Sequence, residues 1–77
     1  MIKKYVIIQG HPILFSTMFM HKDMVGNSIG VESAGFFLLL KEGDTNIVYC
    51  LGESNSLCIR SRGEIDEKII ADFLAVG

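Results

Sequence analysis

The sequence predicts an α+β domain, in which five antiparallel strands form a strongly bent sheet and one C-terminal helix packs on it. Segments such as 36–40 and 47–51 are apolar at consecutive positions, so as strands they place apolar side chains on both faces of a sheet. The connections between such segments are short, which favours antiparallel neighbours over parallel strands with long crossovers. One amphipathic pattern of helical period follows them. Since the 77 residues contain no linker or repeat, we expect a single domain over 1–77.

Five segments predict the strands, and the helix follows them in the order β-β-β-β-β-α. The segments are 2–9, 13–20, 31–41, 46–51 and 56–60. Gly10 and Pro12 separate the first two, because glycine permits unusual backbone angles and proline is tolerated where an edge strand starts. Gly35 predicts a bulge or bend inside the third strand, as isolated strand glycines often do. Turn residues at 42–45 and 52–55 join the last three strands as neighbours.

A short helical turn over 22–25 and a loop over 26–30 connect the second and third strands. The loop matches the G-x-S-x-G pattern of a nucleophile elbow, in which a strained strand-to-helix turn exposes a serine to its histidine base. Here the residues that follow predict a strand instead of a helix, and the chain is too short for a hydrolase sheet. We therefore expect a glycine-rich loop and no catalytic residues.

The C-terminal helix has the clearest local signal. Ser61 and Glu64 fit a capping box, in which each side chain accepts a hydrogen bond from the other residue's backbone N–H. Glu64, Asp66 and Glu67 place negative charge at the positive end of the helix dipole. The apolar positions span about half of the helix circumference, which indicates contact with more than one surface. They are Ile65, Ile69, Ile70, Phe73, Leu74 and Val76.

The predicted sheet presents more apolar surface than this helix covers. Five strands spaced about 4.8 Å apart make a sheet roughly 24 Å wide, whereas one helix covers about 10 Å. The chain is 49% hydrophobic with a mean hydropathy of +0.40, which is more apolar material than a small monomer hides. The uncovered face must either curl into a small barrel or pack against another molecule. We expect a homodimer or another homo-oligomer.

Charge argues against a nucleic-acid partner. Seven Lys and Arg oppose nine Asp and Glu, which gives a net charge of −2, and the basic residues form no extended stripe for a phosphate backbone. Residues 1–30 hold three Lys and one Asp, a balance of +2, and residues 31–77 hold four basic and eight acidic residues, a balance of −4. Such asymmetry can orient the association of two copies.

No segment predicts export or membrane insertion. The apolar run after Lys3 and Lys4 is too short for a signal peptide and lacks a small-residue cleavage site, and no apolar stretch approaches the ~20 residues of a membrane span. We expect a soluble cytoplasmic protein with Cys50 and Cys58 as reduced thiols. A three-residue turn centred on Ser54 would place these cysteines opposite each other in neighbouring strands, as small core side chains.

The histidines predict neither a metal site nor an acid–base pair. His11 lies in a turn and His21 at the expected exposed end of the second strand, with only Asp23 near His21 in sequence. Metal binding by the two histidines with Cys50 and Cys58 would need scattered ligands, without the close pairing of structural zinc sites. We expect no metal and no cofactor.

The strongest candidate for a small polar site is the junction between the fifth strand and the helix. It consists of Arg60, Ser61, Arg62 and Gly63. Two guanidinium groups beside the free N–H groups of a helix start can hold a phosphate or a carboxylate, since charge and dipole act together. The alternative is that the arginines pair with the acidic residues of the first helical turn.

Together these features favour a small non-catalytic interaction or regulatory module that acts as a homo-oligomer, most simply a homodimer. The alternative is a small-ligand or anion-binding protein that uses Arg60 and Arg62, with a small anion as its partner. An enzyme of unknown type is a distant third. Neither a nucleic acid nor a membrane is an expected partner.

Overall fold

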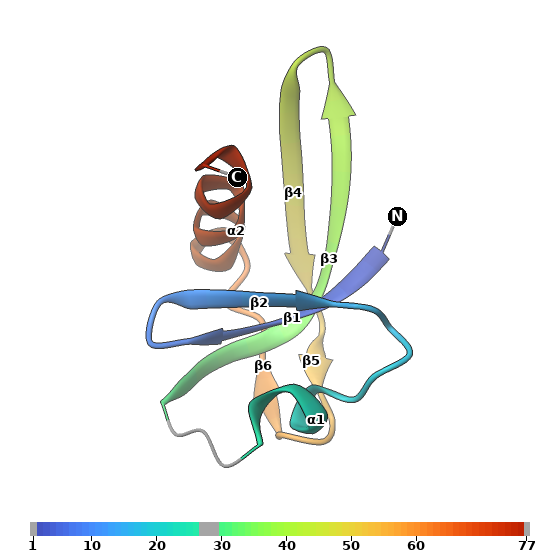
Figure 1. Ribbon diagram of the computed structural model, residues 1–77, viewed down its shortest axis with the longest axis vertical. Coiled ribbons are helices and arrows are strands. Elements are labelled where there is room, and N and C mark those ends of the chain that lie inside the picture. Colours follow the sequence, from blue (N-terminus) through green and yellow to red (C-terminus); the bar gives the residue numbers. More distant parts are fainter. Residues whose placement is uncertain (1, 27–29, 77) are drawn as a thin grey trace.

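The computed structural model describes residues 2–26 and 30–76, which form a four-stranded antiparallel sheet, a small two-stranded sheet and two helices (Figure 1). The elements in chain order are β1 (Ile2–Ile8), β2 (His11–Phe15), α1 (His21–Val25), β3 (Val31–Glu42), β4 (Thr45–Leu51), β5 (Glu53–Ser54), β6 (Ile59–Arg60) and α2 (Glu64–Val76). The main sheet has the order β2-β1-β3-β4. The α+β class, the antiparallel sheet and the C-terminal helix are confirmed. The fifth predicted strand does not join the main sheet, because β6 pairs with β5 in a separate sheet.

β1 lies inside the main sheet and contributes to two cores, one on each face. Alternate side chains of a strand point to opposite faces, so Tyr5 and Ile7 pack with α2 while Val6 faces the other way. All three side chains are fully buried. Consecutive apolar residues in this strand therefore fill both faces, as the sequence predicts.

The two cores define the two faces of the sheet. The inner face carries α2, and its buried core consists of Tyr5, Ile7, Phe37, Val48, Cys50 and Ile70. The outer face is the opposite one, and its buried core consists of Val6, Phe15, Val25 and Ala34. Leu57 and Ile59 pack on this second core from β6 and the turn before it. The outer core is therefore covered by α1 and by the β5–β6 sheet.

β2 ends at Phe15, so its predicted continuation to residue 20 is wrong. The cause is local and lies in Ser16. Its hydroxyl accepts the N–H of Met18 at 3.2 Å, and its C=O accepts the N–H of Phe19 at 3.2 Å, so the chain turns here instead of extending. The helical turn α1 follows and includes the predicted residues 22–25. Ser28 of the G-x-S-x-G pattern lies outside the described residues.

The predicted β3–β4 turn is confirmed, with Gly43 at a φ of 62° that glycine adopts without a steric penalty. Of the bulge or bend predicted at Gly35, the bulge is wrong, because the pairing with β1 is regular there and shifts only between Ile7 and Ile8. A Cβ at Gly35 would lie 2.6 Å from the carbonyl oxygen of Leu51. Glycine is therefore required at this position by a close backbone approach.

The two cysteines do not oppose each other, contrary to the prediction. Ser54 pairs with Ile59, and the Ser54 hydroxyl accepts the N–H of Leu57 at 3.1 Å, which closes a turn longer than the predicted three residues. Cys58 consequently lies in this turn, where it is exposed, whereas Cys50 is buried in β4. Both are free thiols. Burial raises the pKa of the Cys50 thiol to about 12, so this thiol stays protonated.

α2 packs on the inner face through the side on which Asp66, Ile70 and Leu74 follow one another at intervals of four residues. Ile70 and Asp66 are fully buried. Ile65 and Phe73 belong to the broad apolar face that the sequence predicts, yet they stay 57% and 44% exposed. The helix therefore contacts the sheet with a narrower stripe than predicted, and that stripe contains a carboxylate.

Candidate functional site

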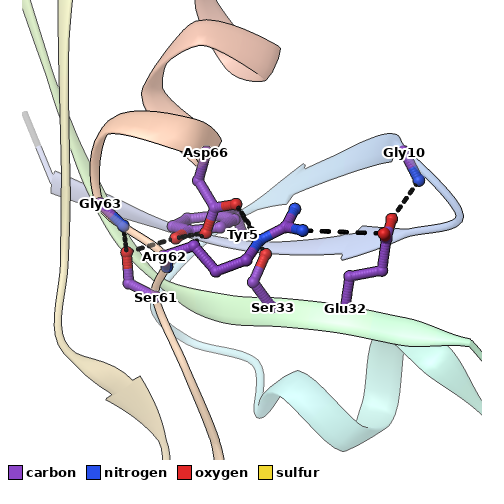
Figure 2. A network of polar contacts seen from close by, with 8 residues as sticks. All are labelled: Tyr5, Gly10, Glu32, Ser33, Ser61, Arg62, Gly63 and Asp66. Carbon is purple, nitrogen blue, oxygen red and sulfur yellow. Dashed lines mark hydrogen bonds and ion pairs between the residues drawn. The ribbon is translucent and has the colours of Figure 1, made fainter.

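The structure separates the two arginines of the predicted anion site. Arg60 lies in β6 with its side chain 86% exposed and its Nε 3.8 Å from the Glu53 carboxylate. Arg62 lies between β6 and α2 with its side chain only 29% exposed, and it turns toward Asp66 (Figure 2). The two guanidinium groups therefore face different surroundings.

Asp66 is the centre of this junction. Its buried carboxylate accepts four hydrogen bonds from three other residues (Figure 2). Oδ1 accepts the Ser33 hydroxyl at 2.8 Å and the Nε–H of Arg62 at 2.9 Å. Oδ2 accepts the Tyr5 hydroxyl at 2.5 Å and the backbone N–H of Arg62 at 2.9 Å. Because Tyr5 and Ser33 belong to the two central strands, the carboxylate holds the first turn of α2 on the sheet.

Ser61 completes the network from the segment before α2. A phenol has one proton, which Tyr5 gives to Asp66, so the Ser61 hydroxyl donates to the Tyr5 oxygen at 2.7 Å. The Ser61 oxygen in turn accepts the N–H of Gly63 at 3.1 Å. The predicted capping box is therefore wrong, because Ser61 and Glu64 are not each other's hydrogen-bond partners. The carboxylate that reaches back across the helix start is that of Asp66.

Protonation states follow from these contacts. Burial by itself raises the pKa of the Asp66 carboxyl, but the hydrogen bonds from Tyr5, Arg62 and Ser33 outweigh it and hold that pKa below its usual value. For Tyr5, burial raises the pKa of the phenol, and the hydrogen bond to Asp66 raises it further. Asp66 is therefore ionised and Tyr5 is a neutral donor, which is the combination that their hydrogen bond requires.

Arg62 extends the network toward the β1–β2 turn. Its Nη1 lies 3.7 Å from one carboxylate oxygen of Glu32, and the other oxygen accepts the N–H of Gly10. Within the described residues its Nη2 is buried and has no hydrogen-bond partner. Asp66 and Glu32 thus supply the negative charge that the sequence prediction assigned to a bound anion. Anion binding at 60–63 stays a prediction.

The sequence assigned Asp66 to the helix dipole and to possible pairing with an arginine, and the pairing with Arg62 is present, but the burial of Asp66 was missed. The available signal was its spacing. Asp66, Ile70 and Leu74 lie four residues apart, which places the acid on the apolar side of the helix. A buried carboxylate needs several donors, and hydroxyls at inward-facing strand positions such as Tyr5 and Ser33 could provide them.

His21 lines a cavity of about 260 Å³ together with residues of β1, β3 and β5. Its predicted exposure is wrong, because only 3% of the residue is exposed. Its Nε2–H donates to the carbonyl of Gly35 at 2.9 Å, and its ring meets Phe15 and Phe36 edge-on at 5.4 and 5.8 Å between centroids. Burial lowers the pKa of His21, so the ring is neutral near pH 7. Asp23 binds the N–H at the start of α1 and not this imidazole.

Within 2–26 and 30–76, no group of three or more His, Cys, Asp or Glu is placed to hold a metal ion. None of the described helices has the length and apolar character needed to cross a membrane. His11 belongs to β2 and not to a turn, and its ring lies 6.0 Å from that of Phe73.

Apolar side chains are exposed together on the outer face of the β3–β4 hairpin and the adjacent start of β1. The pairing places Leu40 beside Ile47 in one row, and Ile2, Leu38 and Tyr49 in the next. Leu51 lies beside Phe36 in a third row. We call six of these residues the outer patch: Ile2, Leu38, Leu40, Ile47, Tyr49 and Leu51. Four of them are exposed by 44 to 57%: Ile2, Leu40, Tyr49 and Leu51.

The outer patch is exposed because the hairpin extends past the elements that cover the outer face (Figure 1). α1 and the β5–β6 sheet pack on the part that faces Val6 and Ala34, and no described segment packs on the hairpin part. The accessible surface is 5068 Å², whereas a compact monomer of this mass exposes about 4,700 Å². The excess agrees with an uncovered sheet face.

Comparisons with protein-family models, with curated proteins and with solved structures found no match for this chain. The interpretation of the site therefore follows from its geometry.

Proposed function

We propose that this chain is a small non-catalytic interaction module that acts as a homodimer, with the outer patch as its self-association surface. The observation that carries the proposal is the continuity of the patch. Six apolar side chains from three strands lie in three adjacent rows, and Lys4, in the row of Leu51, borders them. Exposed apolar patches on a small domain mark interaction sites.

Self-association is energetically reasonable for a patch of this size. Burying the exposed half of a large apolar side chain contributes about 1 kcal/mol. Four such side chains in each of two patches thus contribute about 8 kcal/mol, which is comparable to the ~4–15 kcal/mol that association costs. The polar groups with the most contacts serve the fold: Asp66 holds the start of α2, and His21 donates to a backbone carbonyl. As part of the proposal we retain the expected cytoplasmic setting, in which Cys50 and Cys58 are free thiols.

The proposal is tested by light scattering behind a sizing column, across a dilution series. We expect the wild-type mass to approach twice 8.5 kDa at high concentration. Leu40→Lys and Tyr49→Lys each place a charge inside the apolar interface, and we expect each to raise the dissociation constant about 100-fold or more.

Matched controls are available outside the patch. Ile65 on α2 and Met18 in the turn after β2 are 57% and 88% exposed, so Ile65→Lys and Met18→Lys introduce the same charge at apolar sites that are more accessible than Leu40 and Tyr49. We expect both to keep the wild-type mass. A wild-type mass of 8.5 kDa at every concentration, with circular dichroism that shows a folded chain, would contradict the proposal.

A further inference from the structure

The outer face has opposite charges at its two ends. Lys4 belongs to the outer side of β1, in the row of Phe36 and Leu51, and Glu42 belongs to the outer side of β3, at the hairpin tip. The outer patch extends from the row of Lys4, which contains Leu51, to the row before Glu42. Glu42 lies six positions after Phe36, the β3 residue in the row of Lys4, which corresponds to about 20 Å along the strand.

Neither charge is neutralised by an ion pair among the described residues. The ammonium of Lys4 donates to the carbonyl of Phe19 at 2.8 Å and lies 5.7 Å from the centre of the Phe36 ring. Glu53 is the nearby acid at this end, and it lies 3.8 Å from Arg60. At the tip, Asp44 adds a second negative charge in the turn. The outer face is therefore basic at one end and acidic at the other.

Charge selects between the two aligned ways in which identical outer faces can pack about a two-fold axis, with the axis parallel or perpendicular to the strands. The axis must lie in the plane between the faces, because the faces oppose each other. An axis parallel to the strands would bring Glu42 onto Glu42 and Lys4 onto Lys4, which is repulsive. An axis perpendicular to the strands reverses one copy and brings each acidic tip onto the basic end of the other.

We propose, resting on the proposed function, that the partner is a second copy packed with its β3–β4 hairpin antiparallel to the first, so that Glu42 of each copy lies against Lys4 of the other. The midpoint between the two charges falls between the rows of Leu38 and Leu40. The row of Leu40 and Ile47 then packs on the row that contains Tyr49 in the other copy. The row of Phe36 and Leu51 faces the row of Glu42 and Thr45 of the other copy, so both charged ends find an opposite charge.

The test is a charge exchange followed by sedimentation equilibrium. Because each single change creates two repulsive contacts in a two-fold dimer, we expect Glu42→Lys and Lys4→Glu each to raise the dissociation constant about tenfold at low salt. The double variant restores both pairs in reverse, and we expect its dissociation constant to return to within about threefold of wild type. The single-variant effects should shrink at high salt, since these charges lie at the rim.

Lys41→Glu is the matched control. Lys41 neighbours Glu42 but points to the inner face, so the substitution changes the net charge of the tip as much as Lys4→Glu changes that of the other end. We expect it to leave the dissociation constant within about twofold. The Glu42 side chain makes no ion pair among the described residues, so Glu42→Lys reports on association even if Lys4→Glu, which loses the Phe19 contact, weakens the fold.

The outcomes separate this inference from the proposed function. A wild-type dimer that is indifferent to both single variants, or that the double variant fails to restore, overturns the antiparallel arrangement while the self-association surface stands. A wild type that remains at 8.5 kDa overturns both and assigns the patch to a different partner. Loss in both single variants with recovery in the double variant and no change in Lys41→Glu supports the arrangement.

Discussion

The two halves of the outer face have the same apolar strand pattern and differ only in what covers them. Near α1, Val6 and Ala34 are fully buried. At the hairpin, Leu40 and Tyr49 stay 44% and 48% exposed. The cover comes from short segments, α1 and β5–β6, which reach only the first half (Figure 1). Exposure of the hairpin is therefore a consequence of topology, and the same kind of side chain stabilises the fold in one half and is available for association in the other.

The largest expected effect comes from truncating matched aromatic residues in the two halves. Phe15→Ala removes a side chain that is 6% exposed and leaves a cavity, so we expect the free energy of unfolding to fall by about 3–5 kcal/mol. Tyr49→Ala removes a side chain that is half exposed, and in the monomer we expect a loss of about 1 kcal/mol or less. Urea unfolding measures both.

The protein concentration in this experiment must lie below the dissociation constant, because a dimer adds a concentration-dependent stability. At high concentration Tyr49→Ala should also lose the dimer contribution. Equal losses for the two variants at low concentration would mean that the hairpin half is covered as well, which would remove the distinction between the two halves.

Much of the fold could be predicted because its signals are local. The apolar runs of β1, β3 and β4 and the amphipathic period of α2 each require only neighbouring residues, and these elements are present. The end of β2 and the register of β5–β6 depend on single hydroxyls, those of Ser16 and Ser54, which bond to nearby N–H groups. Serine in such a position competes with strand pairing, and a strand pattern alone does not register that competition.

The site was less predictable, since its key contacts join residues that are far apart in the sequence. The basic pair Arg60 and Arg62 suggested either a bound anion or pairing with acids of the first helical turn, and Arg62 does pair with one of these acids, Asp66, which Tyr5 and Ser33 also hold. The sequence alone predicts only which side of α2 carries Asp66. Which strand hydroxyls approach that side follows from the packing of α2, which no local pattern encodes.

The second prediction compares a buried with an exposed carboxylate on α2. Asp66→Asn keeps the shape of the side chain but removes the charge that faces Arg62, and we expect the free energy of unfolding to fall by about 2–3 kcal/mol. Asp72→Asn removes an exposed partner of Lys68, and we expect a loss within about 0.5 kcal/mol. A similar loss for both would show that the buried network does not hold α2 on the sheet.

Acid unfolding gives a third prediction about the same network. Since the pKa of Asp66 is lowered in the folded state, its contribution to stability is complete above its unfolded pKa of about 3.9. The contribution is lost as the pH falls from there through the lower folded pKa. We expect the wild type to lose more stability than Asp66→Asn over this range in urea titrations at successive pH values. Parallel curves would exclude Asp66 as the group responsible.

The smallest expected effect is the pH dependence of stability that His21 causes in the covered half of the outer face. The pKa of the His21 imidazole is lowered by burial, so as the pH falls below the unfolded value of about 6.5 the unfolded chain gains a proton that the folded chain does not. Stability therefore decreases between that pH and the folded pKa.

His21→Gln can keep a donor near the carbonyl of Gly35 and should lose this pH dependence, whereas His11→Gln should retain it. Because the outer patch contains no histidine or carboxylate, mild acid should weaken the covered half while the apolar contacts of the hairpin half are unchanged. If His11→Gln loses the pH dependence instead, the group that titrates does not belong to the segments that cover the outer core.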